Sequence, residues 1–153
     1  MTLLFAFLIG LLNGLRSFTA PAATAWASYL GWLKLERPLS LVGSLPAALI
    51  FTVLALGEIV ADKLPKTPSR TEPLGLGARV LMGALTGACV AAGGGASTIL
   101  GAVLGVVGAV VGCFGGYQVR TRLVKALGTP DYVVAVAEDL IAIAGSLFVV
   151  SRF

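Results

Sequence analysis

Apolar residues fill this chain in long runs, most of them interrupted only by glycine, proline or an isolated charged residue. Runs of about 20 such residues predict helices that cross a membrane. We expect an all-α, polytopic helical membrane protein, with residues 1–153 forming a single transmembrane domain. The breaks between the runs give about five membrane segments, at approximately residues 2–33, 45–64, 74–92, 97–117 (with the helix open to extension as far as 127) and 131–150.

The first segment is longer than the roughly 20 residues that one span needs. It contains Asn13, Gly14, Arg16, Ser17 and Pro21, a combination that weakens a continuous helix. We therefore predict a broken or re-entrant first segment, which is either one span followed by a half-helix or a hairpin. Transporters place binding sites at such breaks. The alternative for Arg16 is a side chain that snorkels from a kinked helix toward water.

Composition agrees with a membrane protein, since 58% of the residues are hydrophobic and only 12% are charged, against about 25% charged residues in soluble domains. The mean hydropathy is +0.98. The net charge of +4 is better explained by basic cytoplasmic loops than by nucleic-acid binding. The expected partners are therefore the lipid bilayer and a small ion or small molecule, with no nucleic acid.

Two connectors carry the basic residues that set the orientation of a membrane protein. Residues 63–73 and 118–130 contain three basic residues each, whereas residues 93–95 between them contain none. Because two spans separate the basic connectors, they share a side, and the positive-inside rule predicts that this side is the cytoplasm. The C-terminus then lies outside, while the side of the N-terminus depends on whether the first segment is one span or a hairpin.

Glycines recur at four-residue spacing along one side of the fourth segment. Small residues in this pattern allow the backbones of two helices to approach closely. The pattern predicts helix packing, either against a neighbour in the same chain or in a homo-oligomer, for which we favour a dimer. The helix-packing residues are Gly101, Gly105, Gly108, Gly112 and Gly116.

Charged residues inside the predicted spans are the candidate transport or ion-binding residues. A charge deep in a bilayer costs about 2.5–3.5 kcal/mol, so it usually faces a partner or water. Counting along the helices from the neighbouring prolines places Glu58, Arg79 and Glu138 about 10 Å deep from the same side. The full set of candidates is Arg16, Glu58, Asp62, Arg79, Glu138 and Asp139.

Two interpretations of these charges are open. In the first, Arg79 pairs with Glu58 or Glu138 and only locks helices together. In the second, four acids at one level exceed the single arginine there, and the surplus carboxylates bind or relay a cation or a proton. Asp62 shares a helix face with Glu58. Glu138 and Asp139 lie about 100° apart, so at most one of them is expected to point straight into a shared cavity.

The two acidic stretches also suggest an internal repeat. Residues 14–18 precede the acidic residues 57–65, and residues 116–122 precede the acidic residues 136–145. Each half would thus supply an arginine-bearing helix followed by an acid-bearing helix. Three spans separate the two copies in a five-span arrangement, so the pattern predicts an inverted repeat, with any binding site at the repeat interface.

Nothing in the chain matches a catalytic or metal-binding constellation. There is no histidine, and Cys89 and Cys113 lie in apolar stretches without a neighbouring base. We therefore expect no metal, no haem or other cofactor, and no enzymatic activity. The remaining catalytic interpretation would use Glu58 and Asp62 to bind Mg²⁺ together with a diphosphate.

Three stretches carry a resemblance to a known family. In chain order they are "GEIVADKLPKTPSRT" at 57–71, "ARVLMGALTGA" at 78–88 and "VAEDLIAIAG" at 136–145. Together they resemble an uncharacterised family of small bacterial integral membrane proteins, catalogued as domain of unknown function 4126. The resemblance implies a multi-pass protein of the bacterial inner (plasma) membrane and implies no activity. The chain departs from the family pattern in having Ser17 where a proline is expected and no histidine in the fourth segment.

These observations lead to one expected function and one alternative. We expect a small transporter or channel with a buried acidic and arginine cluster open toward the cytoplasm. It would move protons, a cation or a small anionic substrate, including a lipid phosphate, through a hydrated cavity lined by Glu58, Glu138 and Arg16. The alternative is a structural or assembly membrane protein in which the buried charges only pair helices.

Overall fold

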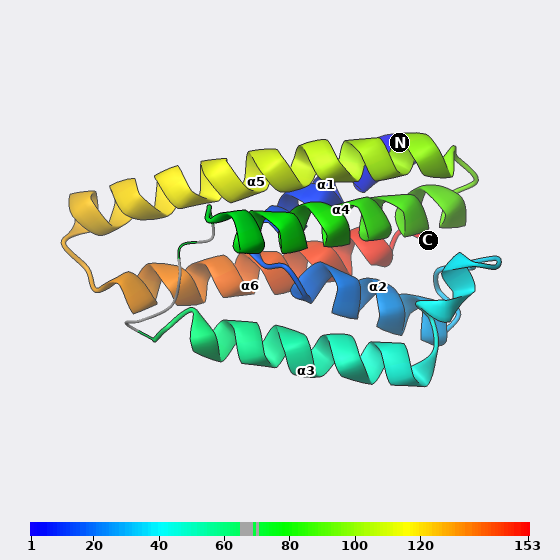
Figure 1. The fold of residues 1–153 in the computed structure, drawn as a ribbon, viewed down its shortest axis with the longest axis horizontal. Coiled ribbons are helices and arrows are strands. Elements are labelled where there is room, and N and C mark those ends of the chain that lie inside the picture. Colours follow the sequence, from blue (N-terminus) through cyan, green and yellow to red (C-terminus); the bar gives the residue numbers. More distant parts are fainter. Residues whose placement is uncertain (65–68, 70) are drawn as a thin grey trace.

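The protein is a bundle of α-helices (Figure 1). A computed structural model describes residues 1–64, 69 and 71–153, and these residues contain no β-strand. A short 3-10 helix, Leu39–Leu41, lies between the second and third α-helices. The α-helices are α1 (Thr2–Leu15), α2 (Thr19–Tyr29), α3 (Leu45–Ala61), α4 (Pro73–Gly93), α5 (Thr98–Leu127) and α6 (Asp131–Val150).

The lengths of these helices agree with a membrane location. α4, α5 and α6 are each long and apolar enough to cross a membrane, and α1 and α3 are shorter apolar helices. Large apolar side chains face outward along them, as Val103, Val107 and Val111 do on α5. In water such a surface would be unusual for a monomer, whereas acyl chains solvate it well. The all-α prediction is confirmed, and the predicted fifth segment agrees with the bounds of α6.

The end of α3, the start of α4 and the turn between α5 and α6 lie at one end of the bundle (Figure 1). Residues 118–127 are not a loop, because α5 continues without a break until Gly128, whose positive φ of 60° ends the helix. At 1.5 Å per residue α5 is about 45 Å long, more than the roughly 30 Å hydrocarbon core. α5 is therefore longer than one span needs, and its last turns carry Arg120, Arg122 and Lys125. In the other connector, Lys66 and Arg70 lie outside the described residues.

The predicted break in the first segment separates α1 from α2. The two helices run in opposite directions, and α2 returns to the end of the bundle where the chain begins (Figure 1). The C-terminus lies at that end as well, since the rings of Phe5 and Phe153 are 5.9 Å apart. α1 has 14 residues, which is about 21 Å and shorter than a full span. α1 and α2 thus form a helical hairpin with its tip inside the bundle.

The glycine-bearing side of α5 packs against α1 and α4 of the same chain. A Cβ on Gly105 would collide with the backbone of Gly83, and one on Gly112 with the backbone of Leu11. Gly101 and Gly108 are buried in the same interfaces, whereas Gly116 is only half-buried. For Gly101, Gly105, Gly108 and Gly112, the partner across the seam is therefore intramolecular.

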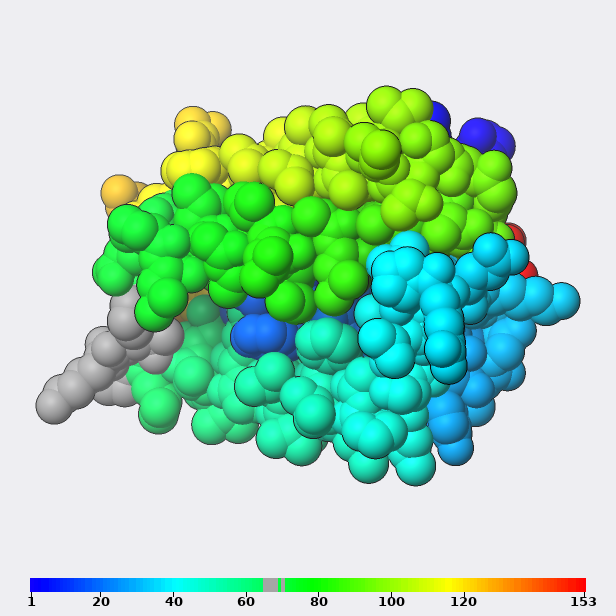
Figure 2. Space-filling view, turned by 45° about the vertical axis from the view of Figure 1, so that its right-hand side comes forward, coloured from blue at the N-terminus to red at the C-terminus, as the bar shows by residue number. Residues whose placement is uncertain are grey.

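α3 lies at the edge of the bundle and packs mainly against α2. Its buried residues are only Ala48 and Ala55. One hydrogen bond, from Trp26 Nε1 to Thr52 Oγ1 at 2.9 Å, joins α2 to the first half of α3. In Figure 2 part of the blue N-terminal segment is visible between α3 and α4, so these two helices do not close over it. The other end of α3 is held by charged side chains.

Candidate functional site: a charge cluster at the helix break

Among the described residues, nine charged side chains from five parts of the fold meet near the α1–α2 break, and we call them the charge cluster. All six residues predicted as candidates belong to it. The other three, Lys63, Arg120 and Asp131, had not been included among the candidate site residues. The members are Arg16, Glu58, Asp62, Lys63, Arg79, Arg120, Asp131, Glu138 and Asp139.

Arg16 is the centre of the charge cluster. The residue is fully buried, with 0% exposure, and its extended backbone ends α1. Its Nε donates to Asp139 Oδ1, and its Nη2 donates to Asp62 Oδ2 at 2.7 Å. Nη1 is buried and has no hydrogen-bond partner among the described residues. The snorkelling alternative is therefore wrong, because this guanidinium is held inside the protein and does not reach toward water.

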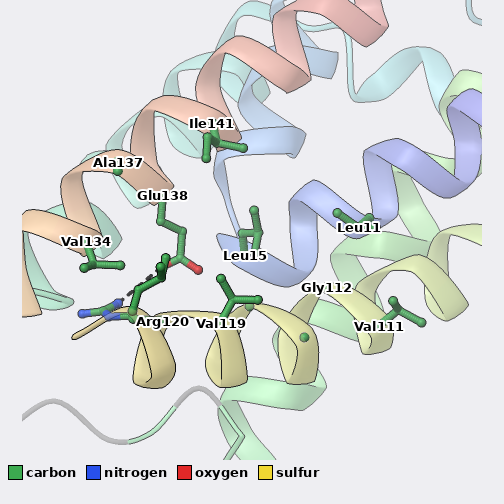
Figure 3. Close-up of a pocket in the computed structure, with 13 residues that line it drawn as sticks. Leu11, Leu15, Val111, Gly112, Val119, Arg120, Val134, Ala137, Glu138 and Ile141 are labelled. Carbon is green, nitrogen blue, oxygen red and sulfur yellow. Dashed lines mark hydrogen bonds and ion pairs between the residues drawn. The ribbon is translucent and has the colours of Figure 1, made fainter. Parts of the chain in front are cut away.

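Arg120 supplies a second guanidinium that sequence reasoning missed. Its Nη1 donates to Asp62 Oδ2 at 2.7 Å and lies 3.4 Å from Glu138 Oε2, while Nε and Nη2 bind Asp131. Figure 3 shows the Arg120 and Glu138 side chains pointing toward each other from α5 and α6. The available signal was that no helix breaker occurs between Tyr117 and Gly128, which leaves Arg120 on the spanning helix and not in a loop.

Glu58 binds the start of α2. Its Oε1 accepts from the backbone N–H of Ser17 at 2.8 Å, and its Oε2 accepts from that of Phe18 at 3.0 Å. Arg79 Nη2 lies 3.4 Å from the same Oε1. Ser17 and Phe18 form the turn just before α2, with Phe18 as its N-cap, where the positive end of the helix dipole favours a negative charge. A carboxylate from α3 therefore stabilises the return helix of the hairpin.

Arg79 and Asn13 join α4 to the end of α1 by hydrogen bonds in both directions. Asn13 Nδ2 donates to the carbonyl oxygen of Arg79 at 2.8 Å, and Arg79 Nε donates to the carbonyl oxygen of Gly14 at 3.0 Å. The last carbonyl groups of a helix lack intrahelical partners, so Arg79 satisfies one of them. Glu58, one of the two predicted partners of Arg79, lies within ion-pair distance of it.

The predicted surplus of carboxylates is wrong for the buried part of the charge cluster. Four acids there, Glu58, Asp62, Glu138 and Asp139, meet four basic residues, since Lys63 binds Asp139 at 2.6 Å and Arg16, Arg79 and Arg120 bind the rest. Asp131 adds a fifth carboxylate, but its side chain is 59% exposed. The sequence count failed because it placed only one arginine at this depth.

Glu138 and Asp139 both reach the charge cluster although they are neighbours on α6. Asp139 turns toward Arg16 and Lys63, and Glu138 turns toward Arg120. The prediction was that at most one of them points straight into a shared cavity, and of the two only Glu138 lines the cavity between α1, α5 and α6. Both carboxylates nevertheless reach the charge cluster, because Arg16 lies within 4 Å of each of them.

The environment of Asp62, which follows the last residue of α3, favours its ionised form. Burial on its own would raise the pKa of this carboxyl group. Hydrogen bonds and charge attraction from Arg16 and Arg120 outweigh burial and hold the pKa well below its usual range. Asp62 is therefore a fixed negative charge that links two arginines at physiological pH.

Two cavities flank the charge cluster. One, of about 330 Å³, lies between α1, α5 and α6, and its lining includes Arg120 and Glu138 with Leu11 and Leu15 (Figure 3). The other, of about 280 Å³, lies between α2, α3 and α6 and begins at Thr19. The predicted common cavity would have joined Glu58, Glu138 and Arg16. Neither of these two cavities includes Glu58 or Arg16 in its lining.

Metal chemistry finds no support in the described part of the chain. Within residues 1–64, 69 and 71–153, no three side chains of histidine, cysteine, aspartate or glutamate are placed to hold a metal ion. The acids that are close together have arginine or lysine between them. This arrangement favours an ion-pair network, in which donors and acceptors alternate, over a cation cage.

Substituting Asp62 should destabilise the protein far more than substituting Asp131. We expect Asp62→Ala to cost at least about 2 kcal/mol, because it leaves Arg16 and Arg120 without their common partner in a buried site. Asp131→Ala should stay within about 1 kcal/mol of the parent protein, because its ion pair is exposed. Thermal unfolding of both purified variants in one detergent tests this order, and equal melting temperatures would contradict it.

The family of the chain follows from a comparison with family models. The model described as "Domain of unknown function (DUF4126)" matches residues 3–151. The chain belongs to the DUF4126 family. The resemblance found in the sequence is thereby confirmed, and the match includes every member of the charge cluster in this DUF4126 protein. A comparison with curated proteins and one with solved structures each gave no match.

Proposed function

We propose that this DUF4126 protein is a small integral membrane transporter or channel for a small anion. The observation that carries the proposal is the α1–α2 break, where a fully buried arginine has one guanidinium nitrogen, Arg16 Nη1, without a hydrogen-bond partner among the described residues. A buried donor without a partner costs free energy. An anion at the break would supply the missing acceptor.

The broken hairpin supports transport, because transporters use half-helices whose N-termini point at anionic groups. The balance of acids and bases in the buried cluster disfavours a cation as the cargo, since no carboxylate there is in surplus. The anionic class includes both free anions and the phosphate of a lipid. Protons remain candidates for a coupled ion, because carboxylates are abundant at the site.

In the proposed orientation, the charge cluster lies toward the cytoplasmic side of the bacterial inner membrane. Lys63 and the basic last turns of α5 lie at that end, and the positive-inside rule assigns it to the cytoplasm. Both termini would then be external. We also propose a homodimer, although the glycine seam of α5 is used within the chain, so a dimer would need another surface.

The inverted repeat stays a prediction. α3 and α6 run in opposite directions, as an inverted repeat requires, whereas α1 and α5 run in the same direction (Figure 1). The paired stretches do converge on the charge cluster, since Arg16 and Arg120 both bind Asp62. In an inverted repeat, the segment equivalent to the end of α5 would therefore be the break around Arg16 and not the whole of α1.

Flux into liposomes tests the proposed function. Inorganic phosphate, sulfate and hexanesulfonate suit the test, because their permanent charge keeps them from crossing lipid unaided. We expect the protein to raise uptake of at least one of them about tenfold over empty liposomes, and Arg16→Lys to remove most of that rise, because lysine keeps the charge but not the planar fork. Arg152→Lys, at the exposed C-terminus, is the matched control.

A cation gradient run in parallel decides between the transport alternatives. Sodium or potassium flux without anion flux would contradict the proposal. Proton movement alone, with no dependence on any anion, would also contradict it and would favour a proton pathway through the carboxylates of the charge cluster.

A structural or assembly role is the second candidate, and the pairing of the buried acids favours it. Each of Glu58, Asp62, Glu138 and Asp139 lies within 4 Å of at least one basic side chain. Such a network could serve only to fix helix positions. Absence of flux for every ion tested, together with co-purification of a defined membrane partner, would support this role over transport.

A further inference from the structure

The carboxylate of Glu58 occupies a position with the properties of an anion-binding site. Two adjacent backbone N–H groups at the start of α2, those of Ser17 and Phe18, donate to its two oxygens at 2.8 and 3.0 Å. The Arg79 guanidinium approaches from α4 at 3.4 Å. We call these two N–H groups and Arg79 the carboxylate seat. The Glu58 side chain is 16% exposed, so the carboxylate seat is accessible from outside the protein.

An apolar cavity of about 280 Å³ begins beside the carboxylate seat. Its lining includes Thr19 and Ile59, which directly follow Phe18 and Glu58 in the chain. Farther along, the walls are apolar, with Ala22, Ala55, Leu56, Ile143 and Leu147. A charged seat at one end of an apolar cavity is suited to a molecule with an anionic head and a hydrocarbon body.

Thr19 provides an independent sign of a missing ligand. The residue begins α2, lines the cavity and is only 7% exposed. Its Oγ1 is buried and has no hydrogen-bond partner among the described residues. Buried hydroxyl groups are nearly always paired, so an acceptor close to the carboxylate seat would satisfy it.

We infer that the carboxylate seat and this cavity bind an aliphatic carboxylate, and that Glu58 is a tethered competitor for the same seat. The inference rests on the proposed function, because it names the class of anion that would be carried. A ligand carboxylate would take the two backbone N–H groups and Arg79, while its hydrocarbon chain would lie along α2, α3 and α6. Glu58 leaves the seat when the ligand enters and returns when the ligand departs.

The competitor model makes a prediction opposite to that of a cation site. Removing Glu58 from a cation site would weaken ligand binding, whereas removing a tethered competitor strengthens the binding of a free carboxylate. The purified protein in detergent provides the test, with hexanoate as the probe. Acetate supplies the head without the chain, and 1-hexanol supplies the chain without the charge.

Glu58→Ala should melt at a lower temperature than the parent protein, because the start of α2 loses its acceptor. We expect hexanoate to restore its melting temperature with an apparent affinity about tenfold higher than for the parent protein, by mass action on the folded state. Acetate should need about tenfold higher concentration than hexanoate, since the apolar chain contributes to binding. Hexanol should not restore stability.

Two further variants keep the test specific. Asp131→Ala also removes a paired carboxylate, but at an exposed position that does not line the cavity between α2, α3 and α6, so hexanoate should not stabilise it. Adding Ala22→Phe to Glu58→Ala should fill part of the cavity and remove the advantage of hexanoate over acetate. Two results would overturn the inference. One is that hexanoate stabilises Glu58→Ala and Asp131→Ala to the same extent. The other is that hexanol and hexanoate have equal effects on Glu58→Ala.

A failure of this inference can be told apart from a failure of the proposed function. Hexanoate binding in detergent without anion flux in liposomes would support the ligand site and contradict the proposed transport function. Anion flux without rescue of Glu58→Ala by any carboxylate would keep the transporter and overturn the aliphatic carboxylate as its ligand. If Glu58→Ala yields no folded protein, Glu58→Gln takes its place, because the neutral amide competes less well for Arg79.

Discussion

Arg16→Gln is expected to leave little folded protein in the membrane. The substitution removes the guanidinium that binds both Asp62 and Asp139 in a fully buried site. Breaking a buried charge pair by removing one partner costs about 3–5 kcal/mol, which is a large share of the stability of a small domain. The yield of monodisperse protein in mild detergent and its melting temperature measure the effect.

The controls for Arg16 separate charge from geometry. Arg16→Lys should fall between the parent protein and Arg16→Gln, because one ammonium group cannot make both the Nε and the Nη2 contacts. Adding Asp139→Asn to Arg16→Gln should recover part of the loss, since it removes one of the charges left unpaired. Parent-like yield and melting temperature for Arg16→Gln would show that the buried arginine is dispensable for folding.

Gly105→Leu is expected to be as damaging, for a purely steric reason. On Gly105 of α5 an added Cβ would collide with the backbone of Gly83 and press on that of Gly87, both on α4. On the α1 side, the backbone of Gly105 leaves no room for a Cβ on Gly10. Backbone cannot move aside as a flexible side chain can, so the helices must separate and lose the packing that drives association in a membrane. We expect a loss of more than about 3 kcal/mol.

Gly115 offers a matched control on the same helix. A Cβ there would meet nothing within 4 Å, so Gly115→Ala should be neutral or stabilising by up to about 1 kcal/mol. Thermal unfolding and protease resistance of the two variants, prepared in the same detergent, give the comparison. Similar melting temperatures for Gly105→Leu and Gly115→Ala would show that the seam in the bundle is looser than the contacts indicate.

The helices of this protein could be predicted well from the sequence, because their signals are local. Apolar runs of sufficient length mark α4, α5 and α6, and helix-weakening residues around Arg16 mark the break. Glycine spacing also identified the packing side of α5, but it could not say which helix packs there. That information lies in the other helices, since Gly10 and Gly83 had no role in the pattern.

The balance of charge in the site could not be predicted, because it depends on long-range contacts and on side-chain reach. Arg120 was assigned to a loop, since the sequence does not mark where α5 leaves the hydrocarbon core. Its long side chain then joins Asp62, which is 58 residues away along the chain. The backbone donors of Ser17 and Phe18 were invisible for another reason, because every residue type except proline carries an N–H group.

The contact between Arg16 and Asp139 has a consequence for biogenesis. The two residues are 123 positions apart, so a growing chain that has already placed the hairpin in the membrane must wait for nearly the whole remaining sequence before this partner exists. Asp62 emerges earlier and neutralises the Arg16 charge only in part, because the second carboxylate, that of Asp139, is still missing. A chain whose synthesis stops before the last helix therefore keeps Arg16 incompletely paired. Membrane quality-control proteases could use this unpaired charge to distinguish unfinished chains from finished ones.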